Sequence, residues 1–391
     1  MSSRSWAARM AVGLSAVIAL AACSTSTEST TEEAAAPAGD GKAITIGVEL
    51  PLSGPTAASA EHLRKGFELT AAEINEAGGV NGSPIRLDIQ DDAADPTTGV
   101  ALVDRFAQNG AVAIVGTYNS AVVLAQSEAI AAAKIPQLVY AISSAITEKK
   151  NPYTFQTGPT DVGLITGIVE RMKSKGLSKP AILTDTTSFG ASAKPVLEKY
   201  LSADGITPAL NDTFAADAAD LSAVLLKAKN SGADSVVAWT TGPAYATLAT
   251  GAQQVGLTLP IFGNGSTAEP SVARLAGSAA DVLYFQDSID DGKPAVKETA
   301  ARWAKEFPDG VPSEAYAAHD MLTAVAGALA ESGPDRVKLR DALESYQSTE
   351  LLTGRAGSSW AFSADNHVGL VGGNLVWLTY DGGQAVPADG S

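Results

Sequence analysis

Two short apolar runs, separated by one Ala-rich helical segment, occupy residues 111–144. The first run, at 111–115, leads into a turn at 116–120, and the second run, at 135–141, ends just before Ser143. A strand, a helix and a second strand within so few residues form a βαβ crossover, which makes the two strands parallel and neighbouring. The sequence therefore predicts a parallel sheet of the α/β class.

Ser120 and Ser143 each follow one of these two strands. Because parallel strands end at the same edge of a sheet, we expect the two residues to lie close together. Ser120 also begins a helix, whose free N–H groups and positive dipole end face outward. Hydroxyls and free amides at such an edge can bind a carboxylate or another small polar group. A purely structural alternative stays open, since Asn119 and Ser120 are residue types that commonly cap helices.

The rest of the chain repeats the alternation of strand and helix. Apolar runs at 44–48, 85–90, 180–183 and 235–239 are typical of strands, and helical segments follow them. Later in the chain we expect helices near 295–306, 313–330 and 335–346, and strands at 359–362 and 374–380. Alternation over this length favours an α/β fold with parallel sheets. A chain of 391 residues exceeds one ordinary domain, and its 45% hydrophobic residues supply material for two cores, so we expect two lobes.

The N-terminal residues have the pattern of an export signal. An apolar run at 10–22 follows two arginines and is too short for a permanent membrane span. Residues 20–23 resemble a bacterial lipobox, in which the cysteine is lipidated. We predict a signal peptide at 1–22, lipidation of Cys23, a flexible tether at 23–42, and a lipid anchor at the extracytoplasmic face of the cell membrane. The alternative is an ordinary signal that is cut nearby without lipidation.

Charge and cysteine content exclude several classes of protein. The formal net charge of −16 opposes binding to nucleic acid and to acidic membrane surfaces, so we expect no nucleic-acid partner. Cys23 is the one cysteine of the sequence, so no internal disulfide can form.

A weak dinucleotide fingerprint occurs at Gly263–Ala268, which fits G-x-G-x-x-A, with Asp287 about twenty residues later. A dinucleotide site requires a helix that begins inside the fingerprint, whereas Pro270 favours a helix that begins after it. We therefore predict no cofactor. An oxidoreductase stays an alternative that a change of melting temperature with NAD would reveal.

Metal-site and catalytic patterns are also weak. Asp91, Asp92 and Asp95 lack the spacing of a calcium loop, and Asp95 followed by Pro96 predicts a helix N-cap instead. The three histidines are far apart, and His319–Asp320 is typical of the polar face of a helix. The sequence has no G-x-S-x-G, S-x-x-K or Walker A motif. We predict neither a metal site nor an enzyme.

Four motifs occur together in an order and spacing that carry a family resemblance: Pro51–Pro55, Asn75–Gly82, Asp91–Pro96 and Gly116–Ser120. From about Ile44 to the C-terminus, the chain resembles the leucine/isoleucine/valine-binding proteins of bacterial ABC importers. The resemblance implies a type I periplasmic-binding fold, or Venus flytrap, in which two doubly wound α/β lobes with parallel sheets are joined by three hinge crossovers.

The resemblance also implies how the chain is divided between the lobes. We expect lobe 1 to contain residues 43–156 and 288–356, and lobe 2 to contain residues 157–287 and 357–391. The three crossovers are expected near residues 156–160, 286–290 and 356–360.

The resemblance implies a ligand site with contributions from both lobes. Ser120 is expected to bind a carboxylate through its hydroxyl and N–H, while the Ala141 carbonyl and the Ser143 hydroxyl contact the polar head of the ligand. The other expected lining residues are Tyr118, Asn119, Phe189, Thr241, Gly265 and Tyr316. Each of these residues could instead serve ordinary packing.

Gly265 departs from the family pattern. Members that bind amino acids carry a glutamate there, which pairs with the ligand ammonium, and a buried ammonium without a carboxylate is costly by several kcal/mol. Either Glu269, Asp287 or Glu61 supplies the charge, or the ligand is not an α-amino acid. Ser59, where the family has an aromatic residue, also predicts a roomier or more polar pocket.

The resulting prediction is a monomeric solute-binding lipoprotein of an ABC importer. It would capture a small polar solute of the branched-chain amino acid class by lobe closure and deliver it to a membrane permease. The alternatives are a carboxylate without an amino group, urea or another amide, and a ligand-sensing module with the same fold.

Overall fold

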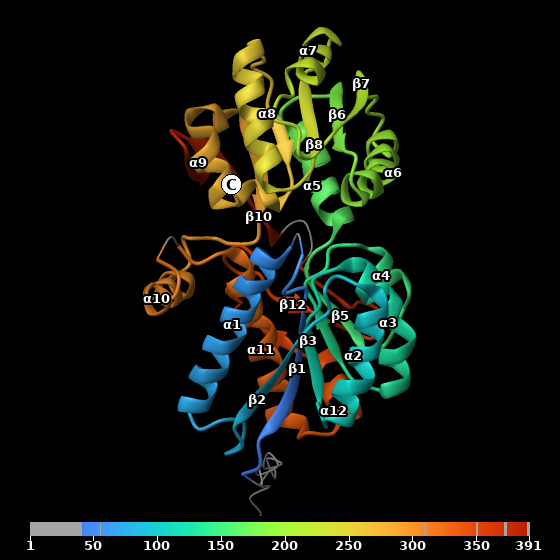
Figure 1. Ribbon diagram of the computed structural model, residues 1–391, viewed down its shortest axis with the longest axis vertical. Helices are drawn as coiled ribbons and strands as arrows, with labels where there is room; N and C mark the ends of the chain where they lie inside the picture. The colour runs from blue at the N-terminus through green and yellow to red at the C-terminus, as the bar shows by residue number, and fades with distance from the viewer. Residues whose placement is uncertain (1–40, 55, 309, 349–350, 371–373, 389–391) are drawn as a thin grey trace, which may run out of the picture. The chain divides into compact units, whose positions relative to one another are not determined.

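Two large, mostly parallel β-sheets with helices packed against them form most of this protein (Figure 1). The computed structural model describes residues 41–54, 56–308, 310–348, 351–370 and 374–388. The predicted signal peptide and Cys23 lie outside the described residues, as does the predicted tether up to residue 40. Within the described ranges, none of the helices combines the length and the apolar character that a membrane span requires.

The first sheet has six strands in the order β13-β5-β4-β3-β1-β2, and every neighbouring pair is parallel. In chain order the strands are β1 (Ile44–Leu50), β2 (Ile85–Asp91), β3 (Ala113–Gly116), β4 (Gln137–Val139), β5 (Thr154–Pro159) and β13 (Val368–Leu370). Ile114 of β3 lies opposite Gln137 of β4. This pairing confirms the parallel βαβ crossover that the sequence predicts for residues 111–144.

The helices that accompany the first sheet begin and end at recognisable signals. They are α1 (Ala57–Glu76), α2 (Pro96–Gln108), α3 (Ser120–Ala133), α4 (Ala145–Glu148), α11 (Ser313–Ser332) and α12 (Arg336–Glu344), while α10 (Pro294–Trp303) precedes α11. The Asp95 carboxylate accepts a hydrogen bond from the Thr98 N–H at 2.7 Å, with Pro96 at the first helical position. The predicted N-cap is therefore confirmed.

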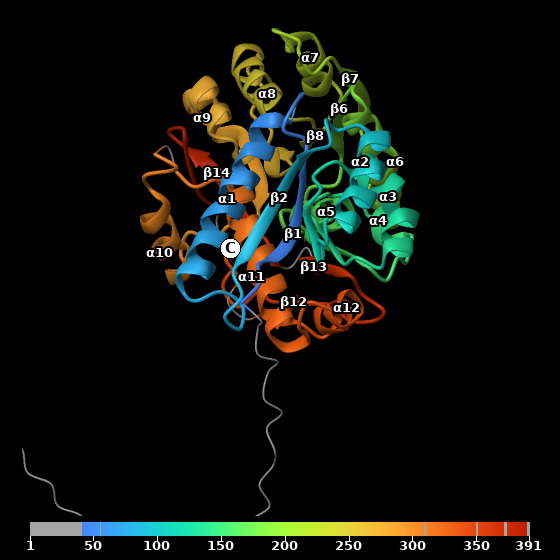
Figure 2. The ribbon, with the colours of Figure 1, turned by 60° about the horizontal axis from the view of Figure 1, so that its bottom comes forward.

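Helices α1 and α11 lie side by side (Figures 1 and 2). Gly66 permits this close packing, because a Cβ atom at its position would lie 2.6 Å from the Ala315 carbonyl oxygen. The contact fixes the first turn of α11, which contains Glu314, against the N-terminal half of α1.

The second sheet has seven strands in the order β15-β14-β10-β9-β8-β6-β7. Its strands are β6 (Pro180–Asp185), β7 (Leu210–Phe214), β8 (Ser235–Trp239), β9 (Ile261–Gly263), β10 (Leu283–Asp287), β14 (Val376–Asp381) and β15 (Gln384–Pro387). The pairs β10–β14 and β14–β15 are antiparallel, and the others are parallel. The accompanying helices are α5 (Asp161–Ser174), α6 (Ser188–Ala203), α7 (Ser222–Asn230), α8 (Gly242–Val255), η1 (Gly265–Ala268), α9 (Pro270–Ala276) and η2 (Gly277–Val282).

The chain passes from one sheet to the other three times along the described strands, between β5 and β6, between β10 and β13, and between β13 and β14. The third passage differs from the prediction, which placed it near 356–360. Val368–Leu370 pairs with β5 of the first sheet, although we assigned 357–391 to lobe 2. β5 pairs with β4 on one side, and its other side would be an open sheet edge without β13. β13 pairs with β5 there and becomes the outermost strand of the first sheet. Since residues 36–391 form one unit by their backbone contacts, the lobe boundaries stay a prediction.

The two-stranded sheet consists of β11 (Gln347–Ser348) and β12 (Trp360–Ala361). The sequence predicted a strand at Ser359–Phe362, but not the pairing with β11. Trp360 is almost fully buried and packs in the core of the first sheet.

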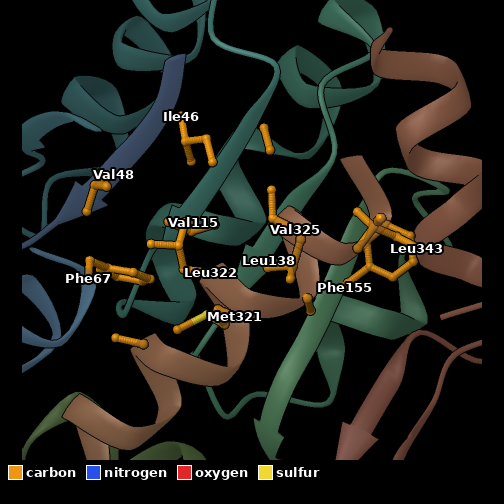
Figure 3. Close-up of a cluster of buried hydrophobic side chains, with 14 of the residues drawn as sticks. Ile46, Val48, Phe67, Val115, Leu138, Phe155, Met321, Leu322, Val325 and Leu343 are labelled. Carbon is orange, nitrogen blue, oxygen red and sulfur yellow. The ribbon is translucent and has the colours of Figure 1, made fainter. Parts of the chain in front are cut away.

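The central strands of both large sheets are buried on both faces, as their nearly continuous apolar sequences require. In the first sheet, Val115 packs with α1 and α11, whereas Ile114 faces the cluster of α2 and α3. Figure 3 shows the former cluster, in which Val48 and Phe67 lie near Met321 and Leu322 of α11. These separate cores hold the carboxyl ends of the strands in place, where the predicted site residues lie.

Candidate ligand-binding site

The turn between β3 and α3, Gly116–Ser120, lies next to the segment that follows β4. The Gly116 carbonyl accepts from the Tyr140 N–H at 3.0 Å, and the Ser120 hydroxyl oxygen accepts from the Ser143 N–H at 3.3 Å. Ser120 and Ser143 are both half-buried. The predicted convergence of these two serines at one sheet edge is therefore confirmed, while their contact with a ligand stays a prediction.

Asn119 is the N-cap of α3. Its side-chain oxygen accepts from the N–H groups of Ala121 at 2.9 Å and Val122 at 3.4 Å. The capping alternative thus applies to Asn119, whereas Ser120 is the first residue of the helix and its hydroxyl is directed to Ser143.

Gln156 of β5 orders the segment after β4. Its side-chain amide donates to the Ala141 carbonyl at 2.6 Å and to the Ser143 carbonyl at 3.3 Å. Ala141 is almost fully buried. A carbonyl oxygen has two lone pairs, so a second donor from a ligand remains compatible with the Gln156 contact. No sequence motif marks Gln156, because its role depends on the order of the strands.

One tyrosine lies within the turn and another lies in the segment after β4. The ring centroids of Tyr118 and Tyr140 are 6.3 Å apart, with the planes inclined by 39°. Burial raises the pKa of both hydroxyls, and the negative charge of Glu314 raises both further. Glu269 also acts on Tyr118, and Asp287 on Tyr140, so both tyrosines lie within the field of carboxylates that belong to other elements.

Glu269, Asp287 and Glu314 form a group of carboxylates around these tyrosines. Burial raises the pKa of Asp287 to about 7, with Glu314 and Asp291 adding to the shift. Burial and the charge of Glu314 also raise the pKa of Glu269. The Nδ1 atom of His62 lies 3.9 Å from the Glu314 carboxylate. Carboxylates that lie near one another raise each other's pKa, so a positively charged group between them is favourable.

Glu61 differs from these carboxylates. It lies on α1 and is ion-paired with Arg64, whose guanidinium Nε donates at 2.7 Å. That hydrogen bond lowers the pKa of the Glu61 carboxyl. Because Glu61 already has a cationic partner, Glu269 and Asp287 are the better of the three candidates for an ammonium partner.

Gly265 is exposed at the start of η1, and a Cβ atom there would meet only the Gln286 carbonyl oxygen, at 3.8 Å. The position therefore has room for a side chain, and packing does not explain its glycine. Glu269 lies four residues later. Its carboxylate packs directly against Gly242, because a Cβ atom at that glycine would overlap the carboxylate. It is thus placed against the first residue of α8, where the helix dipole favours a negative charge.

The remaining predicted residues have a less direct relation to the site. Thr241 is exposed at the N-cap of α8, and its side chain makes no capping hydrogen bond. Phe189 packs near Trp239, with ring centroids 6.0 Å apart. Tyr316 is buried, stacks against Trp303 and belongs to a small core with Ile289. Packing accounts for much of the environment of Phe189 and Tyr316, so their ligand contacts stay predictions.

Other features do not add a second site. A cavity of about 370 Å³ opens at the end of α6, and none of the predicted ligand residues lines it. Its lining consists of Glu198, Ser202, Ile206, Thr207, Pro208 and Asn211. Within the described part of the chain, no group of three or more His, Cys, Asp and Glu side chains is arranged to hold a metal ion. Asp95 has the capping role described above, whereas the carboxylates of Asp91 and Asp92 accept from the N–H groups of Ala93 and Ala94.

Comparison with known proteins identifies the family. The pattern of the family described as "Periplasmic binding protein" matches residues 43–373, which include every predicted ligand residue. The chain belongs to this family. It is a family of substrate-binding transport proteins that act outside the cytoplasm, and not a class of enzymes.

Among its relatives, this periplasmic binding protein is 28% identical over 342 residues to the Leu/Ile/Val-binding protein homolog 1 of Brucella abortus (strain 2308), which covers 82% of this chain and 91% of the relative. It is 26% identical to the Leu/Ile/Val-binding protein BraC3 of Rhizobium johnstonii, over 72% of this chain and 78% of the relative.

Solved structures show the same α/β fold. The substrate-binding protein LivJ of a branched-chain amino acid transporter from Streptococcus pneumoniae, in complex with isoleucine, matches with a TM-score of 0.76 and 21% identity, over 88% of this chain and 97% of that one. A fatty acid ABC transporter substrate-binding protein from Thermomonospora curvata matches with a TM-score of 0.71 and 22% identity, over 90% and 93%.

Proposed function

We propose that this protein captures a small amino acid of the branched-chain class for an ABC importer. The observation that carries the proposal is the convergence of the Ser120 and Ser143 turns at one sheet edge, beside a group of carboxylates. The two turns offer hydroxyls and helix N-terminal amides to a carboxylate. Glu269 and Asp287 offer negative charge to an ammonium.

Glu269 takes the place of the glutamate that Gly265 lacks. It lies in the same connection after β9, four residues further along the chain. The charges of Glu269 and Glu314 both act on Tyr118, which places them around the residue next to Asn119 and Ser120. A ligand ammonium between these carboxylates would relieve their mutual repulsion, and the raised pKa of Glu269 indicates that such relief is favourable.

Anchoring and delivery complete the proposed cycle. Lipidated Cys23 and the tether at 23–42 would hold the protein at the extracytoplasmic face of the membrane as a monomer. Closure of two lobes on the ligand would then present a matched surface to the permease, because the closed state alone would offer contacts from both sides.

A thermal-shift panel tests the proposed ligand class, with L-leucine, L-isoleucine, L-valine, L-glutamate, urea, benzoate and hexanoate. We expect leucine, isoleucine or valine to raise the melting temperature by several degrees at about 100 times the Kd, where binding adds about 2.7 kcal/mol of stability. Glu269→Gln should abolish this rise, whereas Glu170→Gln, at an exposed position on α5, should leave it unchanged.

A second candidate ligand is a carboxylate without nitrogen. Gly265 favours it, since the expected ammonium partner is missing there, and the structural likeness to a fatty acid binder agrees with it. Stabilisation by benzoate or hexanoate, together with no response to the amino acids, would replace the first proposal by this one.

A further inference from the structure

A buried hydrogen-bond network lies directly behind the β3–α3 turn, and its centre is Glu49. This residue is the sixth residue of β1, and its side chain is fully buried. One carboxyl oxygen accepts from the side-chain amide of Gln126 on α3, and the other accepts from the Thr117 hydroxyl at 3.3 Å. A carboxyl group is seldom fully buried without a cationic partner, so its presence here requires an explanation.

Gln137 of β4 closes the network. Its side-chain amide donates to the Thr117 hydroxyl oxygen at 3.0 Å and to the Gln126 side-chain oxygen at 2.8 Å. The four side chains come from β1, β4, α3 and the β3–α3 turn, so the network ties that turn to three elements of the first sheet and its helix layer. All four are fully buried.

Thr117 is the strained residue of the turn. Its φ of 20° is unfavourable for a β-branched residue, and such strain costs roughly 1–3 kcal/mol. Glu49 holds this residue at two points, since its carbonyl accepts from the Thr117 N–H at 2.7 Å and its carboxyl accepts from the hydroxyl. Gly116 before it has a φ of 106° and would place a Cβ atom 2.6 Å from the Glu49 carbonyl oxygen.

The charges around Glu49 favour its neutral form. The elements packed against it present Gln90 from β2, Gly99 from α2, Gln126 from α3 and Gly116 from β3. Asp92, which follows β2, is the titratable group whose charge acts on it. Asp92 is itself fully buried, and among the described residues its Oδ2 atom has no hydrogen-bond partner.

We propose that Glu49 is a positioning residue for the ligand site: as a neutral acid it holds the strained Thr117, and with it Tyr118, Asn119 and Ser120, and rising pH loosens the turn. The inference rests on the proposed function, because the turn it controls is the one assigned to the ligand carboxylate. Glu49 touches no ligand in this arrangement and acts through Thr117.

The direction of the pH effect follows from linkage. Burial first, and then the charge of Asp92, raise the pKa of Glu49 from its usual 4.5 to about 8 in the folded protein. When the turn opens and water reaches Glu49, the pKa of Glu49 returns toward 4.5. Between pH 4.5 and about 8, Glu49 is therefore protonated in the closed turn and ionised in the open turn. The free energy of opening therefore falls as the pH rises from about 5 to about 8, and changes little above that.

Hydrogen–deuterium exchange of the ligand-free protein tests the proposal, with protection corrected for the intrinsic exchange rate at each pH. In the wild type, protection of peptides covering 113–126 should fall by up to about tenfold per pH unit between about pH 5 and 8. Glu49→Gln keeps the size and offers one acceptor and one donor, as the neutral acid does, but it cannot ionise. Its protection should therefore change little above the Asp92 pKa of about 6. Glu128→Gln, on the exposed face of α3, should behave as the wild type does.

Asp92→Asn supplies a second readout if Glu49→Gln folds poorly. Removing the Asp92 charge lowers the pKa of Glu49 in the closed turn, so the fall in protection should end at a lower pH than in the wild type. The proposal is overturned if Glu49→Gln retains the wild-type pH profile, if protection falls equally in all peptides, or if Asp92→Asn does not shift the end of the transition. No ligand is needed, so failure here is distinct from failure of the ligand panel.

Discussion

Ser120 combines a hydroxyl group with a position in the first turn of α3, where backbone N–H groups are free to bind an anion. Its hydroxyl already accepts one hydrogen bond, from the Ser143 N–H, and can still donate its own proton to a ligand. This arrangement makes Ser120 the residue most suited to a carboxylate.

Ser120→Ala should therefore weaken ligand binding without unfolding the protein. A hydrogen bond to a charged group contributes about 1.5–3 kcal/mol, so the Kd should rise about tenfold to a hundredfold. Isothermal titration with the ligand that the thermal-shift panel identifies measures the change. Ser345→Ala, at an exposed position after α12, is the matched control. An unchanged Kd for Ser120→Ala would show that the serine only orders the backbone.

The local signals in the sequence were sufficient for some residues and not for others. The convergence of Ser120 and Ser143 follows from the order of two strands and one helix, and it is confirmed. The electrostatic effect of Glu314 on Tyr118 and Tyr140 was not predicted. Glu314 lies near these tyrosines only because α11 packs against α1, and that packing cannot be read from the local sequence. Glu49 directly follows the apolar run at 44–48, and nothing in its neighbours along the chain indicates a buried network.

At the scale of elements, periodicity and turn residues were informative for long segments. Helix α11, expected at 313–330, is observed at Ser313–Ser332, and α12, expected at 335–346, at Arg336–Glu344. A strand of three residues is predicted where an apolar run marks it, as for β4, but β13 and the six-residue β5 were not predicted. Their places depend on which sheet edge is free, and that is a property of the assembled sheet.

Asp320 shows how a neighbouring element changes the role of a side chain. The sequence favoured a polar helical face for His319–Asp320, but Asp320 is buried. Its carboxylate accepts from the N–H groups of Leu352 and Thr353, both at 2.8 Å, and from the Thr353 hydroxyl at 2.6 Å. The same segment is bound from the other side by Lys293, whose ammonium donates to the carbonyls of residues 351–354.

Asp320→Ala should destabilise the protein by about 2–4 kcal/mol, because three buried donors lose their acceptor. Chemical denaturation measures the change in the free energy of unfolding. Asp341→Ala, which removes an exposed carboxylate on α12, should change it by no more than about 0.5 kcal/mol. Equal effects of the two substitutions would mean that water replaces the Asp320 carboxylate.

At the scale of the whole molecule, attachment to the membrane is predicted to depend on one thiol. Cys23→Ser removes the group that carries the lipid, and the described helices supply no span to replace it. A single acyl chain binds a membrane weakly, so loss of all chains should release the protein. In a bacterial host that processes lipoproteins, detergent phase partition should find the wild type in the detergent phase and Cys23→Ser in the aqueous phase. A wild type in the aqueous phase would favour a non-lipidated signal.

The empty space beside Gly265 has an evolutionary consequence. Codons for glycine and glutamate can differ by a single base, and a Cβ atom at this position would meet only the Gln286 carbonyl oxygen, at 3.8 Å. One nucleotide change could thus add a carboxylate at the proposed binding site. Diversification of nutrient preference in such a lineage would then require no intermediate with a damaged core.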